Sequence, residues 1–132
     1  MENKPFDKFS QAVSSAAQKF GESLGQLAQK IGKETEKLAR IASLKTEIFR
    51  IQNERRGKVE LLGEKVIKLY KENNLTPEGF ESCTETIRQI LGMEEEISKK
   101  NIEIKKIQEE EKITDEEVAE IPIDEKSSTV DK

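Results

Sequence analysis

The chain of 132 residues contains no Trp, no His, one Tyr and one Cys, and only 5% of its residues are aromatic. Without His, it lacks the side chain that most often serves as a general base or a metal ligand near neutral pH. The lone Cys83 excludes an internal disulfide and a Cys-rich zinc cluster, and it is typical of a reducing compartment. We therefore expect no enzymatic activity, no metal and no other cofactor.

Long apolar runs are also missing. The sequence has no run of 18 apolar residues, and charges interrupt its N-terminal stretch every few positions, so we expect neither a membrane span nor a secretory signal. Only 33% of the residues are hydrophobic while 38% are charged, which is too little apolar material for a thick globular core. This composition predicts an elongated all-α protein in the cytoplasm.

The charge is distributed unevenly along the chain. Residues 1–40 hold seven Lys and Arg against five Asp and Glu, a net charge of +2, and residues 41–112 hold 14 against 15, a net charge of −1. Residues 113–132 hold two against seven, a net charge of −5. The gradient indicates three segments: an N-terminal segment 1–40, a middle segment 41–112 and an acidic tail 113–132.

The middle segment carries heptad-like apolar spacing, which predicts a coiled coil. Apolar residues step by threes and fours from residue 41 to residue 69, interrupted at Arg55, and again from residue 80 to residue 104, interrupted at Glu94 and at residue 101. Folding one run back on the other places Arg55 opposite Glu94. We therefore expect an antiparallel helical hairpin in which this pair fixes the register. The expected apolar seam includes Val59, Phe80 and Ile87.

Between the two runs, "YKENNLTPEGFES" breaks the periodicity and predicts a turn near residues 73–79. Thr76 can cap a helix that has Pro77 at its first position.

The basic stretch "RIQNERRGK" at residues 50–58 lies opposite "EEE" at residues 94–96 in this register. This stretch could be a phosphate-binding patch, but we expect charge pairing within the chain instead. Nucleic-acid binding would need a larger excess of Lys and Arg, interleaved with stacking aromatics, so no nucleic-acid partner is expected. The single Cys83 occupies a seam position and is expected to be a buried core residue.

The N-terminal segment repeats at a period of eleven, as "DKFSQAVSSAA", "QKFGESLGQLA" and "QKIGKETEKLA" over residues 7–39. Eleven residues make about three helical turns, so each block renews one apolar face of an amphipathic helix. This face is a candidate surface for a membrane or for a protein partner. Its predicted large residues are Phe9, Val13, Phe20, Leu24, Leu27, Ile31 and Leu38, flanked by Lys8, Lys19 and Lys30.

This repeat resembles the eleven-residue amphipathic repeats of the synucleins, perilipins and exchangeable apolipoproteins, which lie on lipid surfaces as long helices. The resemblance is one of pattern and covers residues 7–39, with three blocks where those families commonly have more. It implies adsorption to an anionic membrane surface. Eleven-residue repeats also occur in desiccation-associated helical proteins and right-handed coiled coils.

A second resemblance covers residues 38–107. The stretch "LGEKVIKLYKENNL", followed by a short helix containing a Cys, looks like the coiled-coil module at the front of small bacterial zinc-ribbon proteins. Those proteins continue into two Cys pairs that bind zinc. Residues 108–132 contain no Cys or His, so no zinc function can be carried over.

The acidic tail, with Pro122 and a Ser/Thr cluster, is expected to be disordered, and "IPI" at residues 121–123 is a weak candidate docking motif.

Two functions remain open. The first is a non-enzymatic structural or adaptor protein that acts through protein partners or self-association. The second is a peripheral membrane or lipid-surface protein that binds through the N-terminal helix. The structural function is slightly favoured, because most amphipathic helices bury their apolar face in protein.

Overall fold

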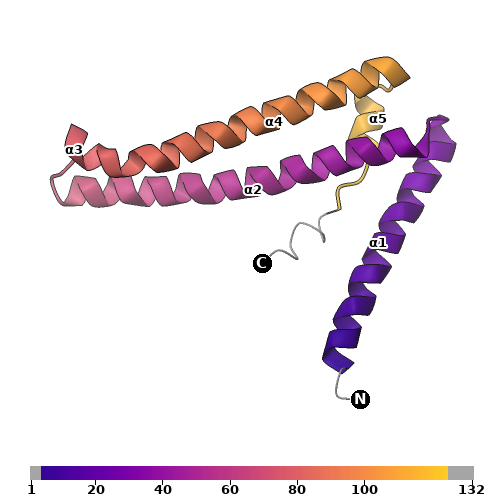
Figure 1. Cartoon of the computed structure of the whole chain (residues 1–132), viewed down its shortest axis with the longest axis horizontal. Coiled ribbons are helices and arrows are strands. Elements are labelled where there is room, and N and C mark those ends of the chain that lie inside the picture. Colours follow the sequence, from indigo (N-terminus) through magenta and orange to yellow (C-terminus); the bar gives the residue numbers. More distant parts are fainter. Residues whose placement is uncertain (1–3, 125–132) are drawn as a thin grey trace. The chain divides into compact units, whose positions relative to one another are not determined.

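The computed structural model describes residues 4–124, with side chains from residue 18 onward. The elements follow the order α1 (Lys4–Ile31), α2 (Thr35–Lys71), α3 (Pro77–Phe80), the short 3-10 helix η1 (Glu81–Cys83), α4 (Thr84–Glu111) and α5 (Asp115–Glu120) (Figure 1). The expected all-α class is confirmed, because all of these elements are helical and the described residues form no strand.

Each of the three long helices is followed, within two residues, by a residue with left-handed backbone conformation, which does not continue the helical hydrogen-bond pattern. These residues are Gly32 (φ 70°), Asn73 (φ 57°) and Lys112 (φ 56°). The break at Gly32 divides the N-terminal segment, which the sequence predicted as one helix over residues 1–40. The third eleven-residue block is therefore shared between two helices, and Leu38 lies in α2 instead of on the face of α1.

The chain forms two compact units. Of the described residues, unit 1 contains 4–49 and 102–124, and unit 2 is Arg50–Asn101. Unit 1 thus combines α1, the start of α2, the end of α4 and α5. The apolar core of unit 1 consists of Leu24, Leu27, Leu38, Ile41, Ala42, Leu44, Ile48, Ile104, Ile107, Ile113 and Ile121, each at most 8% exposed.

Burial of these aliphatic side chains is the main stabilising contribution in unit 1. Fully burying one Leu or Ile contributes about 1.5–3 kcal/mol. An ion pair adds a polar link between α2 and α4, with Arg40 Nε and Nη2 donating to Glu103 Oε2 at 2.9 and 2.7 Å. Both side chains are more than 40% exposed, so solvent screens the pair and its contribution is small.

The expectation of a disordered tail is not confirmed for residues 113–124. Thr114 and Glu117 form a capping box at the start of α5, in which each side chain accepts a hydrogen bond from the other residue's backbone N–H. Ile113 before the helix and Ile121 after it are 4% and 2% exposed. Two buried isoleucines and a capped helix therefore order a segment that composition alone assigned to disorder. The remaining tail residues lie outside the described part of the chain.

Unit 2 contains the end of α2, the turn and the start of α4. The expected cap is present, because Gly79 N donates to Thr76 Oγ1 at 3.1 Å and Pro77 opens α3. Contacts also join the two sides of unit 2. Arg55 Nε and Nη2 of α2 donate to Glu94 Oε2 of α4 at 2.9 and 2.6 Å, and Lys65 Nζ of α2 donates to the carbonyl of Ser82 in η1 at 3.4 Å.

The buried side of unit 2 differs in detail from the predicted seam. Val59, Phe80 and Ile87 are 39–40% exposed, whereas Thr86 is buried and Lys58 is half-buried. The reason is that the three-four spacing continues through Arg55 without a skip, so that the inner positions of α2 include Lys58 and Lys65. The aliphatic part of a lysine can cover apolar surface while its ammonium group stays in water.

The tight turn of unit 2 generates a prediction. A Cβ atom at buried Gly79 would collide with the backbone carbonyl of Asn74, whereas a Cβ at Gly57 meets nothing within 4 Å. Gly79→Ala should therefore lower the free energy of unfolding by about 1–3 kcal/mol. The matched change Gly57→Ala should raise it by up to about 1 kcal/mol, because Ala is the better helix former. Urea denaturation followed by circular dichroism measures both, and equal effects would contradict this account of the turn.

Candidate functional site

The apolar face of α1, which the sequence indicates as a candidate surface for a membrane or a protein partner, is largely buried over its last three turns. Leu24 and Leu27 are 5% and 8% exposed, and Phe20 and Ile31 are half-buried. Residues on the other side of the helix, such as Glu22 and the flanking Lys19 and Lys30, are exposed. The predicted face is therefore the buried face of α1 wherever its side chains are described.

The remaining predicted residues lie elsewhere. The side chains of Lys8, Phe9 and Val13 lie outside the described residues. Leu38 is fully buried in the core of unit 1, where it belongs to α2. Arg55 and Glu94 form their ion pair in unit 2, and these two side chains are 40% and 44% exposed.

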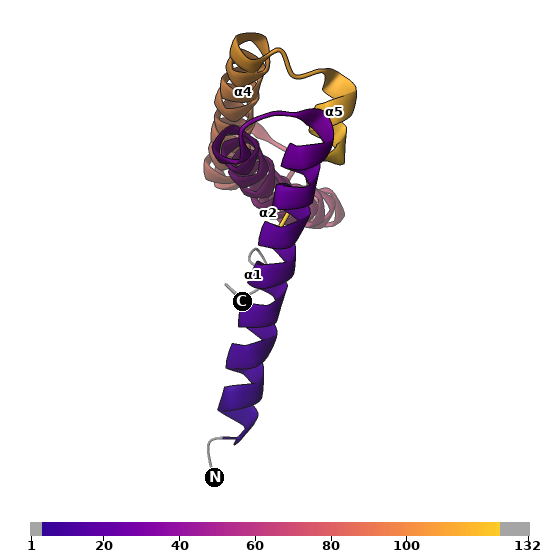
Figure 2. The same ribbon diagram turned by 90° about the vertical axis from the view of Figure 1, so that its right-hand side faces the viewer.

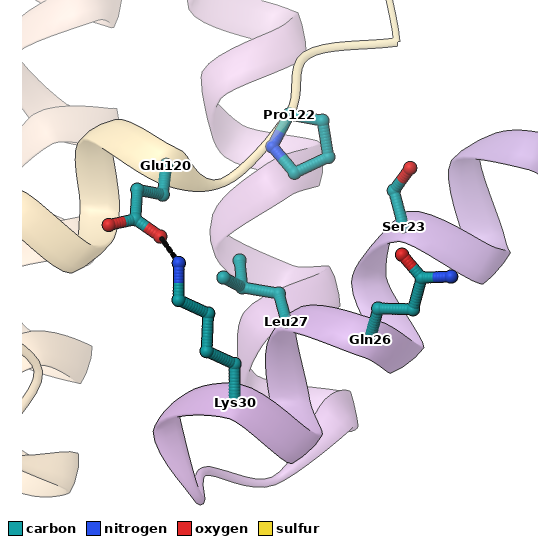
Figure 3. A pocket seen from close by; sticks show the side chains of 6 residues that line it. All are labelled: Ser23, Gln26, Leu27, Lys30, Glu120 and Pro122. Atoms are coloured by element: carbon teal, nitrogen blue, oxygen red, sulfur yellow. Dashed lines mark hydrogen bonds and ion pairs between the residues drawn. The ribbon is translucent and has the colours of Figure 1, made fainter.

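Helix α5 covers part of the α1 face. Figure 2 shows α5 beside the C-terminal end of α1, where Lys30 Nζ lies 3.4 Å from Glu120 Oε1. Next to this ion pair is a shallow cavity of about 300 Å³ (Figure 3). Its lining comes from α1, from α5 and from the residues after α5: Ser23, Gln26, Leu27, Lys30, Glu120 and Pro122.

A lysine of α2 binds the C-terminal end of α5. Lys45 Nζ donates to the backbone carbonyls of Val118 and Ile121 at 2.7 and 2.6 Å. A cation there is favourable, because the carbonyls at a helix C-terminus lack partners within the helix and carry partial negative charge. Burial lowers the pKa of the Lys45 ammonium group from its usual value.

The next residue of α2 holds the chain beyond α5. Thr46 Oγ1 accepts a hydrogen bond from Asp124 N at 3.0 Å and donates to the Ala42 carbonyl at 2.9 Å. Lys45 and Thr46 thus fasten the segment 118–124 to α2 through its backbone. We call these contacts, together with buried Ile121, the tail clasp.

The turn from α4 into α5 is ordered by a buried glutamine. Gln108 Nε2 donates to the Ile113 carbonyl at 3.2 Å and to Asp115 Oδ1 at 2.8 Å. The hydrogen bond from Gln108, followed by the charge of Lys105, holds the pKa of Asp115 below its usual value. Buried Gln108 is thus satisfied by the same residues that connect α4 to α5, as a buried polar group must be.

The lining of the cavity mixes polar, charged and apolar side chains. The cavity offers one hydroxyl, one amide, two apolar side chains and an ion pair whose members face each other. Within the part of the chain that the structure describes, no three His, Cys, Asp or Glu side chains gather closely enough to hold a metal ion. No helix in that part is both long enough and apolar enough to cross a membrane.

Sequence reasoning missed the residues of the tail clasp and its connection to α4. Lys45, Thr46 and Gln108 carry no motif of their own. The available signal was in the tail, where Thr114 and Glu117 have the spacing of a capping box and isolated isoleucines stand among acidic residues. The "IPI" stretch, expected to be at most a weak docking motif, contains the buried Ile121 and the cavity residue Pro122.

Comparisons of the chain with protein-family models, with curated proteins and with solved structures found no match.

The tail clasp yields a prediction about local stability. Lys45→Met keeps the length of the side chain but removes both donors to α5, and a hydrogen bond from a charged group contributes about 1.5–3 kcal/mol. Amide hydrogen exchange of residues 113–124 should accelerate roughly tenfold or more. The exposed Lys68 of the same helix provides the control, and Lys68→Met should leave exchange in these residues unchanged. If Lys45→Met also leaves it unchanged, Lys45 does not hold the tail.

Proposed function

We propose that this chain is a non-enzymatic structural or adaptor protein that acts through contacts with protein, either with a partner or with a second copy of itself. The observation that carries the proposal is the burial of Leu24 and Leu27 in unit 1. These are the central large residues of the face that would enter a lipid surface. A face already covered by the core of its own chain is not available for lipid.

Unit 2 supports the same proposal as an antiparallel helical hairpin of the coiled-coil type. Residue 55 of α2 contacts residue 94 of α4, and residue 65, further along α2, contacts residue 82 in η1 just before α4, as expected for two segments that run in opposite directions. The Thr76 cap and Pro77 provide the reversal between them. Such a hairpin offers long helical surfaces and no enclosed site, which suits a spacer or a binding module.

The absence of catalysis is part of the proposal and rests on residue types. The chain has no His to act as a base, and its only Cys is fully buried. A reactive thiol is normally at least partly accessible to solvent. The proposed setting is the cytoplasm, which the single free cysteine favours.

A second candidate function, adsorption to an anionic membrane surface, has its own support. Helix α1 is 28 residues long, and Lys19 and Lys30 are exposed beside its apolar face. Each lysine near an anionic surface contributes up to about 1 kcal/mol. In this alternative, the tail clasp would have to open so that Leu24 and Leu27 could reach the lipid.

Flotation of the full chain with vesicles of equal parts phosphatidylcholine and phosphatidylglycerol distinguishes the two functions. The adaptor proposal predicts that the wild-type chain stays in solution. Ile121→Asp places a charge at a fully buried position and should release the tail, so this variant is expected to bind the vesicles more strongly than wild type. Wild-type chain that floats with the vesicles, and loses this property in Phe20→Asp, would overturn the adaptor proposal in favour of the membrane function.

A further inference from the structure

Most large apolar side chains that remain exposed belong to unit 2. Five of them are Val59, Tyr70, Phe80, Ile87 and Leu91, which are 40%, 71%, 40%, 39% and 58% exposed. A whole aromatic side chain has about 150–250 Å² of surface, and an aliphatic one has less, so these fractions leave roughly 400 Å² of apolar surface in water. This lies within the roughly 300–600 Å² typical of the largest patch on a monomer.

These five residues share one position relative to the buried side of their helices. In both α2 and α4 most buried and half-buried positions step by threes and fours. Val59, Tyr70, Ile87 and Leu91 each come one place after such a position, and Phe80 of α3 comes one place after buried Gly79. Val59 follows Lys58, and Leu91 follows buried Ile90. One residue corresponds to about 100° of rotation, so the four residues of α2 and α4 lie on the same rotational side of their own helix.

In the proposed hairpin this rotational side is a single surface. Two right-handed helices that pack side by side and run in opposite directions have a simple symmetry. The residues one place after the contact positions of one helix lie on the same face of the pair as the residues one place after the contact positions of the other helix. We call this surface the apolar face of unit 2. The opposite surface, one place before each inner position, is polar except for Leu61, and it consists of Glu54, Gly57, Leu61, Glu64, Lys68, Ser82, Glu85, Gln89, Gly92 and Glu96.

We propose that a second copy of this chain covers the apolar face, forming a two-fold dimer in which the two hairpins make a four-helix bundle. The inference rests on the proposed function and specifies its partner and surface. A two-fold axis parallel to the helices would place α2 of one copy against α4 of the other. Because Arg55 contacts Glu94 within one chain, these two residues lie at the same height along the axis, and this contact fixes which residues of the two copies face each other. Every helix then has antiparallel neighbours, as in up-down-up-down bundles.

The facing residues are complementary in size under this symmetry. Gly63, where an added Cβ atom meets nothing within 4 Å, would lie opposite the partner's Ile87. Tyr70 would lie opposite the partner's Phe80, and Val59 opposite the partner's Leu91. A small residue facing a large one allows the two layers to interdigitate.

The charges at the end of the apolar face also match. Arg56 follows the inner position Arg55 and would face the partner's Glu94, so opposite charges meet where the apolar residues stop. The apolar surface amounts to about half of the approximately 800 Å² that each partner contributes to a standard interface. Polar residues at the edge can supply the remainder.

Sedimentation equilibrium of the full chain, from about 1 to 100 µM, tests the proposal with a matched pair of variants. The wild-type chain should dimerise. Leu91→Glu places a charge on the apolar face and should weaken dimerisation at least about tenfold, whereas Leu61→Glu makes the same change on the polar surface and should have little effect. Circular dichroism checks that each variant keeps its helices.

A second experiment tests the facing of residues 63 and 87. Gly63→Leu should weaken dimerisation by overpacking against the partner's Ile87, and Ile87→Ala should weaken it by leaving a cavity. Mixing the two variants should restore dimers that contain one copy of each, which pairing within one chain cannot explain. The control Gly57→Leu, also in open space but on the polar surface, should dimerise like wild type.

Three results would overturn the dimer: a wild-type chain that is monomeric at 100 µM, equal effects of Leu91→Glu and Leu61→Glu, or no mixed dimers from the second pair. Each leaves the vesicle experiment unaffected, so failure of the dimer and failure of the adaptor proposal can be told apart.

Discussion

The burial of apolar side chains in each unit depends on how many helices pack around them. The rest of the structure follows from this number. Two helices side by side leave the flanks of their seam in water, so a third or fourth element must cover them. In unit 1, α1 and α5 contribute to the core along with α2 and α4, and the aliphatic residues are almost fully buried. In unit 2 the chain provides only two long helices, and large apolar residues stay exposed.

This contrast explains why the tail matters to a chain with few hydrophobic residues. Ile121 contributes buried surface to unit 1, and Lys45 and Thr46 fix the backbone around it. The contacts lie far apart in sequence, so the segment 113–124 acts as an element of the core and not as an appended charge block. The same contacts hold the C-terminal end of α5 against α2, within the unit that also contains α1.

The sequence predicted the features that depend on local pattern. Helical class follows from periodicity, the cap at Thr76 from the residue types around Pro77, and the proximity of Arg55 to Glu94 from their shared interruption of the apolar spacing. Three features differ from the prediction. The end of α1 is local, because Gly32 adopts a left-handed conformation. The other two depend on tertiary contacts that periodicity does not register: Lys58 and Lys65 occupy inner positions through their aliphatic stems, and the acidic tail is ordered by Ile113 and Ile121.

The central claim is that burial in unit 1 is complete within one chain, whereas burial in unit 2 is completed by a second copy. Hydrogen–deuterium exchange of the full chain at increasing protein concentration tests it most directly, because only intermolecular contacts depend on concentration. Amide protection in residues 59–70 and 80–91 should rise with concentration, while protection in residues 38–48 stays constant. Protection that is independent of concentration in both units would contradict the claim.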